Sequence, residues 1–152
     1  QGVQVVHLTG KGKDQEVRDA VKAAGVADRW HVIDYLSTME DALALADLVV
    51  CRSGAGTVAE MTALGLPCVY VPLPIGNGEQ KLNAADHVAH GGALLVADND
   101  LTSDYVRGTI FPLPGSEKLS EMAIASRALA RPDGAQQLAD LIESTLQKKD
   151  QK

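Results

Sequence analysis

Residues 51–60 form the sequence pattern that is best suited to binding a ligand. An apolar run ends at Cys51, a turn of small residues occupies positions 53–56, and a helical pattern begins at Thr57. Glycines in such a turn let backbone amides approach a ligand closely. The amides at a helix N-terminus are unpaired, and the helix dipole favours negative charge there. The pattern therefore predicts a phosphate or diphosphate site at this turn.

Glu60 lies about one helical turn further along, where its carboxylate can accept hydrogen bonds from neutral hydroxyls such as those of a ribose. Thr57 and Glu60 also fit a capping box, in which Glu60 reaches back to the Thr57 amide. A cap alone does not require the small residues 54–56 together. The ligand-binding role of Glu60 is therefore favoured, and the capping box stays open as the alternative.

A second candidate segment is the long connection at residues 72–80. Two prolines fix its course and two glycines allow close approach. Gln80 and Asn83 then begin the next helical pattern on the same edge as Glu60. An amide side chain offers both a donor and an acceptor, which suits sugar hydroxyls.

The remaining motifs do not predict a phosphate-binding loop, a cofactor site, a metal site or a catalytic nucleophile. The basic loop at residues 9–13 is not a Walker A motif, because Asp14 stands where Ser or Thr should follow, and we interpret it as a solvated turn. No G-x-G-x-x-G pattern links a strand to a helix, so no nicotinamide or flavin cofactor is predicted. His87 and His90 lack a third ligand at suitable spacing, so no metal site is predicted. No nucleophile motif is present, and no catalytic residue is predicted in this chain.

Composition narrows the function classes. A chain of 152 residues is long enough for one well-buried domain, and its net charge of -6 argues against a nucleic-acid groove. No apolar run approaches the roughly 20 residues of a transmembrane helix, and no secretory signal opens the chain. Cys51 and Cys68 lie in apolar runs and are expected to be buried thiols in a reducing compartment. Because the chain starts without methionine close to an apolar run, we expect it to be a piece of a larger protein.

Short apolar strands alternate with helical patterns, which is typical of an α/β fold with a parallel sheet and helices on both faces. The strands are expected at residues 3–8, 31–36, 48–51, 68–71 and 93–96. The helices are expected at residues 14–24, 39–46, 57–64, 79–90, 103–109, 116–129 and 134–147. The last helix is amphipathic, so we expect it to pack back on the domain, with residues 148–152 as a frayed polar tail. Ligands of such sheets bind at the carboxyl ends of the strands.

The sequence resembles a known family at these residues. The matching motifs are 51–60, Ala63-Leu-Gly-Leu-Pro67, Val71-Pro-Leu-Pro74, Glu79-Gln-x-x-Asn83-Ala84, His7-Leu-Thr-Gly-Lys-Gly12 and Tyr35-Leu36. They resemble the MurG family of bacterial N-acetylglucosaminyltransferases, and the resemblance fades after Ala97. It implies a Rossmann-like fold that forms one half of a GT-B glycosyltransferase. Residues 1–147 are then the carboxyl-terminal nucleotide-sugar-binding domain of a two-domain enzyme.

The resemblance also implies roles for single residues. Leu36 reads uracil through its backbone amide and carbonyl, Glu60 holds the ribose hydroxyls, and Gln80 reads hydroxyls of N-acetylglucosamine. The residues implied at the diphosphate are Ala55, Gly56, Thr57, Val58 and Ala59. Gly56 departs from the bulkier residue that some members carry, but its amide role survives. The family pattern adds no metal and no cofactor.

The implied activity is transfer of N-acetylglucosamine from UDP-N-acetylglucosamine to lipid I, which forms lipid II for peptidoglycan. The implied parent is a peripheral protein at the cytoplasmic face of the bacterial plasma membrane, and its amino-terminal half contacts lipid I and the membrane. This chain alone is expected to be soluble and inactive, because it lacks that half. It also lacks the G-G-S-Q-G loop expected just before Gln1, whose serine normally contacts the donor, so its donor binding is expected to be weakened. Two alternatives remain: a free-standing UDP-sugar-binding subunit of a split transferase, and a GT-B UDP-N-acetylglucosamine 2-epimerase.

Overall fold

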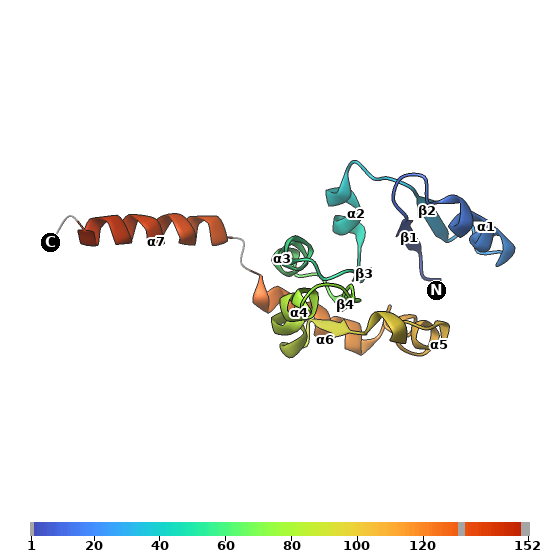
Figure 1. Ribbon diagram of the computed structural model, residues 1–152. Helices are drawn as coiled ribbons and strands as arrows, with labels where there is room; N and C mark the ends of the chain where they lie inside the picture. The colour runs from blue at the N-terminus through green and yellow to red at the C-terminus, as the bar shows by residue number, and fades with distance from the viewer. Residues whose placement is uncertain (1, 131–132, 150–152) are drawn as a thin grey trace. The chain divides into compact units, whose positions relative to one another are not determined.

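The computed structural model describes residues 2–130 and 133–149 of the chain. Strands and helices alternate from β1 to β5 (Figure 1). The chain divides into two compact units, Gln1–Asp47 and Leu48–Lys152, and each is described by itself.

The first unit is built around two parallel strands. Its elements are β1 (Val5–Leu8), α1 (Gln15–Ala23), β2 (Trp30–Ile33) and α2 (Met39–Leu45). Parallel strands need a crossover connection, which α1 supplies. Val21 on α1 and Val32 on β2 are buried, so the helix covers one face of this small sheet.

The second unit holds a three-stranded parallel sheet in the order β3-β4-β5. The strands are β3 (Val49–Cys51), β4 (Cys68–Tyr70) and β5 (Ala93–Leu95). The helices between them are α3 (Ala55–Leu64) and α4 (Glu79–Ala89). The helical elements that follow are η1 (Asp98–Asp100), α5 (Ser103–Tyr105), η2 (Val106–Ile110), α6 (Glu117–Leu129) and α7 (Gly134–Lys149).

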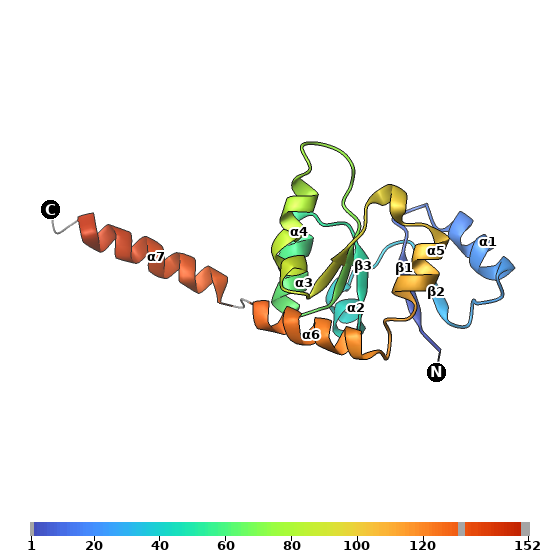
Figure 2. The same cartoon turned by 90° about the horizontal axis from the view of Figure 1, so that it is seen from below.

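Helices cover both faces of this sheet, because alternate residues of the central strand point to opposite sides. Val69 belongs to a buried cluster with Leu119 and Met122 of α6. Tyr70, the next residue, instead contacts His87 on α4. Figure 2 shows α3 and α4 next to one another, as their contacts require. The predicted α/β class with parallel strands and helices on both faces is confirmed.

The five strands form two parallel sheets rather than the single sheet that we predicted. Within each sheet the neighbouring strands are parallel and are joined by crossover helices, so the α/β class holds for each unit by itself.

Two helix predictions were wrong in detail. Helix α3 begins at Ala55, two residues before the predicted start, because Gly54 takes an extended N-cap conformation with ψ 150°. The predicted helix at residues 103–109 begins as α5 and continues as a π-helix, in which Phe111 donates its amide hydrogen to the Val106 carbonyl at 2.9 Å. Single-residue propensities do not report such a change of hydrogen-bond register.

The prediction that the last helix packs back on the domain was wrong. Its apolar side chains at Leu138, Leu141, Ile142 and Leu146 are each more than half exposed. Amphipathic spacing predicts the helix but does not specify the surface that covers its apolar face. The helix runs to Lys149, beyond its predicted end, and residues 150–152 of the predicted tail lie outside the described residues. Within the described part of the chain, no helix is long and apolar enough to cross a membrane.

Candidate functional site

The N-terminus of α3 presents free backbone donors, as the sequence predicts for an anion site. Gly54 is the N-cap, and the amides of Ala55, Gly56 and Thr57 have no acceptor among the described residues. The amide of Val58 is not free, because it donates to the Gly54 carbonyl at 2.9 Å. Ala59 lies one residue deeper, where helical amides bond to the carbonyl four residues back. The donors available to an anion are therefore the amides of residues 55–57.

Ser53 fixes the position of this turn. Its side chain is fully buried, and its carbonyl accepts a hydrogen bond from Nδ2 of Asn83 at 3.1 Å. Its hydroxyl has no partner among the described residues.

Glu60 is free to bind a ligand. It is the sixth residue of α3, and its exposed carboxylate has no hydrogen-bond or ion-pair partner within the described ranges. The capping-box alternative is wrong, because Gly54 rather than Thr57 occupies the N-cap position. A carboxylate in the second turn does not cap the helix, and it can accept hydrogen bonds from hydroxyls.

Gln80 is anchored to the connection that precedes it. It lies in the first turn of α4 and is half-buried, and its Oε1 atom accepts a hydrogen bond from the Leu73 amide at 2.9 Å. The sequence offers this side chain as both donor and acceptor. In the structure the acceptor atom is already bonded, so Nε2 remains as the group that can donate to a sugar oxygen.

Sequence reasoning missed Arg52, the residue that follows β3. Its Nη1 atom donates to the Val71 carbonyl at 3.2 Å and approaches the Pro72 carbonyl at 3.5 Å. The same atom forms an ion pair with Asp98, which follows β5. A guanidinium placed directly after a strand at the ligand-binding edge was the available signal, since Arg is suited to contact several oxygens at once.

Leu36 lies in the first unit, between β2 and α2, and is half-buried. The neighbouring residue Tyr35 has the Lys11 ammonium 4.5 Å from its ring centroid, a cation–π contact. The Thr9 amide also donates to the Ile33 carbonyl at 3.1 Å. The loop that we interpreted as a solvated turn is therefore tied to the segment that carries Leu36. Leu36 and the other predicted residues belong to different units, so the candidate site is described in two parts.

His87 is a buried structural residue of α4. Its two ring nitrogens lie 3.0 Å from the Tyr70 hydroxyl and 2.8 Å from Oγ of Ser126. Ser126 donates to the Gly92 carbonyl, so it accepts from Nε2 of His87, and Nδ1 accepts from Tyr70. Burial lowers the pKa of His87 and raises that of Tyr70, which keeps both side chains neutral. The described residues hold no group of three or more His, Cys, Asp or Glu side chains suited to a metal.

Cys51 and Cys68 are free thiols on adjacent strands. Cys68 is buried as predicted, whereas Cys51 is only half-buried. A hydrogen bond between the two thiols lowers the pKa of Cys51 and raises that of Cys68. They lie on the face of the sheet that also carries Tyr70.

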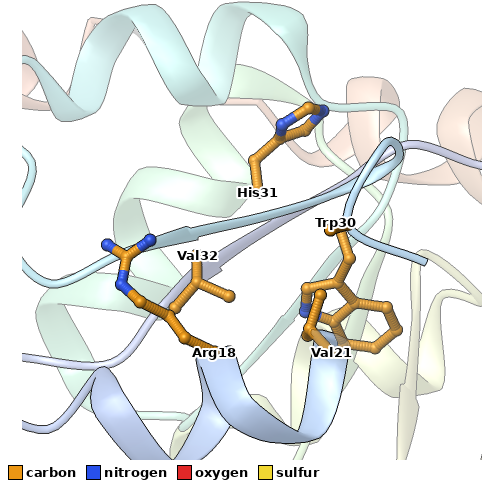
Figure 3. A pocket seen from close by; sticks show the side chains of 6 residues that line it. Arg18, Val21, Trp30, His31 and Val32 are labelled. Carbon is orange, nitrogen blue, oxygen red and sulfur yellow. The ribbon is translucent and has the colours of Figure 1, made fainter. Parts of the chain in front are cut away.

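A separate hollow lies in the first unit between α1 and β2. It is lined by Arg18, Val21, Ala27, Trp30, His31 and Val32. Figure 3 shows Trp30 and Val32 on the side of β2 that faces α1, whereas His31 points to the opposite side. None of the predicted donor-binding residues lines this hollow.

The chain is similar to known glycosyltransferases in sequence and in structure. Residues 1–138 match the glycosyltransferase family 28 C-terminal domain. A relative from Paenarthrobacter aurescens is 46% identical over 142 residues, and a relative from Bifidobacterium adolescentis is 52% identical over 120 residues. Both are called UDP-N-acetylglucosamine--N-acetylmuramyl-(pentapeptide) pyrophosphoryl-undecaprenol N-acetylglucosamine transferase. The alignments cover 93% and 70% of this chain but only 38% and 30% of the relatives.

Solved structures show the same partial coverage. The crystal structure of MurG from Acinetobacter baumannii superposes with a TM-score of 0.80 at 30% identity, over 93% of this chain and 41% of that one. The kitacinnamycin glycotransferase superposes with a TM-score of 0.61 at 25% identity, over 95% of this chain and 43% of that one. This chain is thus similar to less than half of each protein.

Proposed function

Because the chain belongs to the family of glycosyltransferase family 28 C-terminal domains, we propose that it is the donor-binding half of an N-acetylglucosaminyltransferase. The donor is UDP-N-acetylglucosamine and the acceptor is lipid I, a muramoyl-pentapeptide on an undecaprenyl pyrophosphate carrier. The two relatives described above carry names with the same donor and carrier. Residues 1–147 form the nucleotide-sugar-binding domain in this proposal.

The observation that carries the proposal is the N-terminus of α3. The unpaired amides of Ala55, Gly56 and Thr57 and the positive end of the helix dipole suit a diphosphate. Glu60 lies on the same helix, three residues after Thr57, and its free carboxylate suits the ribose hydroxyls. In the other unit, the backbone of Leu36 supplies the uracil contact in this assignment.

The chemistry is an inverting displacement. The muramoyl hydroxyl attacks the anomeric carbon of the sugar, the glycosidic bond to the diphosphate breaks, and UDP leaves with the bonding electron pair. The hydroxyl proton passes to a base outside this chain. The amides of residues 55–57 stabilise the charge that develops on the diphosphate, an electrostatic contribution of the oxyanion-hole kind.

The acceptor and the membrane are contacted by the other half of the transferase in this proposal. An undecaprenyl carrier is anchored in the bilayer, so the whole protein acts as a peripheral protein at the cytoplasmic face. This chain contributes donor recognition alone. It is therefore expected to bind the donor without completing the transfer.

A chimera tests this division of roles. This chain is joined to the amino-terminal half of the Paenarthrobacter aurescens relative and supplied with lipid I and UDP-N-acetylglucosamine. Formation of lipid II by the chimera, with none formed by the chain alone, supports the proposal. Turnover by the chain alone contradicts it, and conversion of the donor to its 2-epimer supports the epimerase alternative.

A further inference from the structure

One arginine connects the ends of all three strands in the second unit. Arg52 follows β3, and its Nη1 atom contacts the carbonyls of Val71 and Pro72 where β4 ends. The same nitrogen pairs with the carboxylate of Asp98, which lies beyond β5. In parallel sheets these strand ends form the ligand-binding edge. The guanidinium therefore fixes the exit of β4 relative to its neighbours.

The segment after β4 that Arg52 contacts also forms a hydrogen bond with α4. Leu73 follows the two carbonyls and donates its amide hydrogen to Oε1 of Gln80. Three residues after Gln80, Asn83 donates to the carbonyl of Ser53. Ser53 is the next residue after Arg52, so these hydrogen bonds close a ring.

This ring passes through both parts of the proposed site. One part is the turn at Ser53, which precedes the free amides of α3. The other part is Gln80, whose Nε2 atom remains free for a sugar. A shift of the β4 exit therefore changes the distance between the diphosphate donors and the sugar-reading amide, whereas the donors themselves stay within α3.

The chemistry of the contacts favours arginine at this position. All of these contacts are made by Nη1, and a planar guanidinium holds that nitrogen in a fixed orientation, whereas a lysine ammonium lies on a flexible stem. The ion pair with Asp98 is about half exposed, so it contributes little to stability. Its effect is to orient the guanidinium toward the two carbonyls.

We propose that Arg52 is a positioning residue that sets Gln80 relative to the α3 amides and thereby gives the site its preference for the complete nucleotide sugar over UDP. The proposal rests on the proposed function of this site. Arg52 does not contact the donor in this account. It acts through the Val71 and Pro72 carbonyls.

The test uses the chimera described above with Arg52→Gln, Arg52→Lys and Asp98→Asn. Arg107→Gln is the matched control. Arg107 forms an exposed ion pair with Asp104, as Arg52 does with Asp98, but it has no contact with the backbone carbonyls that follow β4. For Arg52→Gln we expect the KM for UDP-N-acetylglucosamine to rise about tenfold, because an orienting contact is lost. The inhibition constant of UDP should change by less than about twofold. Arg52→Lys should recover only part of the loss. Arg107→Gln should leave both constants unchanged.

A second readout does not depend on ligand. Hydrogen exchange of the Leu73 amide should accelerate in Arg52→Gln and stay unchanged in Arg107→Gln, because the ring holds that amide against Gln80. If Arg52→Gln fails to fold, Asp98→Asn carries the same test. Equal weakening of UDP and UDP-N-acetylglucosamine, or unchanged exchange at Leu73, overturns the proposal. Failure of the unsubstituted chimera and of Arg107→Gln to bind any uridine nucleotide would instead refute the proposed function.

Discussion

The amide of Leu73 donates to the Oε1 atom of Gln80 at 2.9 Å, which leaves the side-chain nitrogen of Gln80 as its free polar group. The bond links the connection after β4 to the first turn of α4. It thus fixes both the orientation of the amide and the chemistry that remains for a ligand. A sugar oxygen that binds at this nitrogen accepts a hydrogen bond from it.

Gln80→Glu tests this division between the two atoms. A carboxylate can still accept from the Leu73 amide but cannot donate to the sugar, so the affinity for UDP-N-acetylglucosamine should fall about tenfold, in the range of one lost hydrogen bond. UDP affinity should fall less. Calorimetric titration of the chimera measures both affinities. Gln80→Ala is the comparison, because it also removes the bond to Leu73; equal affinities for Gln80→Glu and the unsubstituted protein would contradict the assignment.

Glu60→Ala separates ligand binding from helix capping. If Glu60 holds ribose hydroxyls, its loss weakens UDP binding by roughly 1.5–3 kcal/mol, as expected for hydrogen bonds to a charged group. The free energy of unfolding should change by less than about 0.5 kcal/mol, because the exposed carboxylate has no partner among the described residues. Urea unfolding and nucleotide titration of the same variant check the two parts. A large loss of stability with intact UDP affinity would restore a structural role for Glu60.

Gly56→Ala should be tolerated. A Cβ atom added at Gly56 meets nothing within 4 Å, and the residue lies at the second position of α3. Alanine is favoured over glycine in helices by up to about 1 kcal/mol, so thermal unfolding should occur at the same or a slightly higher temperature. UDP affinity should be retained because the amide remains. Loss of UDP affinity would show that the ligand needs the space that glycine leaves open.

The buried His87 predicts a pH dependence of stability. Burial lowers the pKa of His87 from its ordinary value of 6.5, and the Asp86 carboxylate opposes this shift. Below about pH 6.5 the unfolded chain therefore binds a proton that the folded chain resists. The free energy of unfolding should fall as the pH decreases through this range and level off below the pKa of the folded state.

Urea unfolding at about pH 7.5 and about pH 5 measures this dependence. His87→Gln should flatten the dependence, whereas His90→Gln, at an exposed histidine beside Asp86, should leave most of it in place. The same pH dependence in the His87→Gln variant would contradict the assignment to His87.

Local sequence patterns were sufficient to predict most of the fold. Apolar runs such as Cys68–Tyr70 and helical spacing such as Glu79–Ala89 predicted elements within a few residues of those observed. The start of α3 was predicted too late, because the sequence reads as a turn through Gly56. Glycine is permissive enough to occupy the first turn of a helix after an extended N-cap.

The candidate site was predictable only in part. Motif resemblance identified Glu60, Gln80 and the turn before α3, since these depend on local spacing. The bond between Leu73 and Gln80 and the contacts of Arg52 join segments that the sequence does not show to be neighbours. The same holds for the buried partners of His87, which come from β4 and α6.

The most direct measurement is an amide NMR titration of the 152-residue chain with UDP and, in parallel, with uridine. We expect UDP, but not uridine, to shift the amides of Ala55, Gly56 and Thr57, because only UDP carries the diphosphate that these donors bind. Both ligands should shift Leu36. UDP-dependent shifts that leave residues 55–57 unmoved would show that the N-terminus of α3 does not bind the diphosphate.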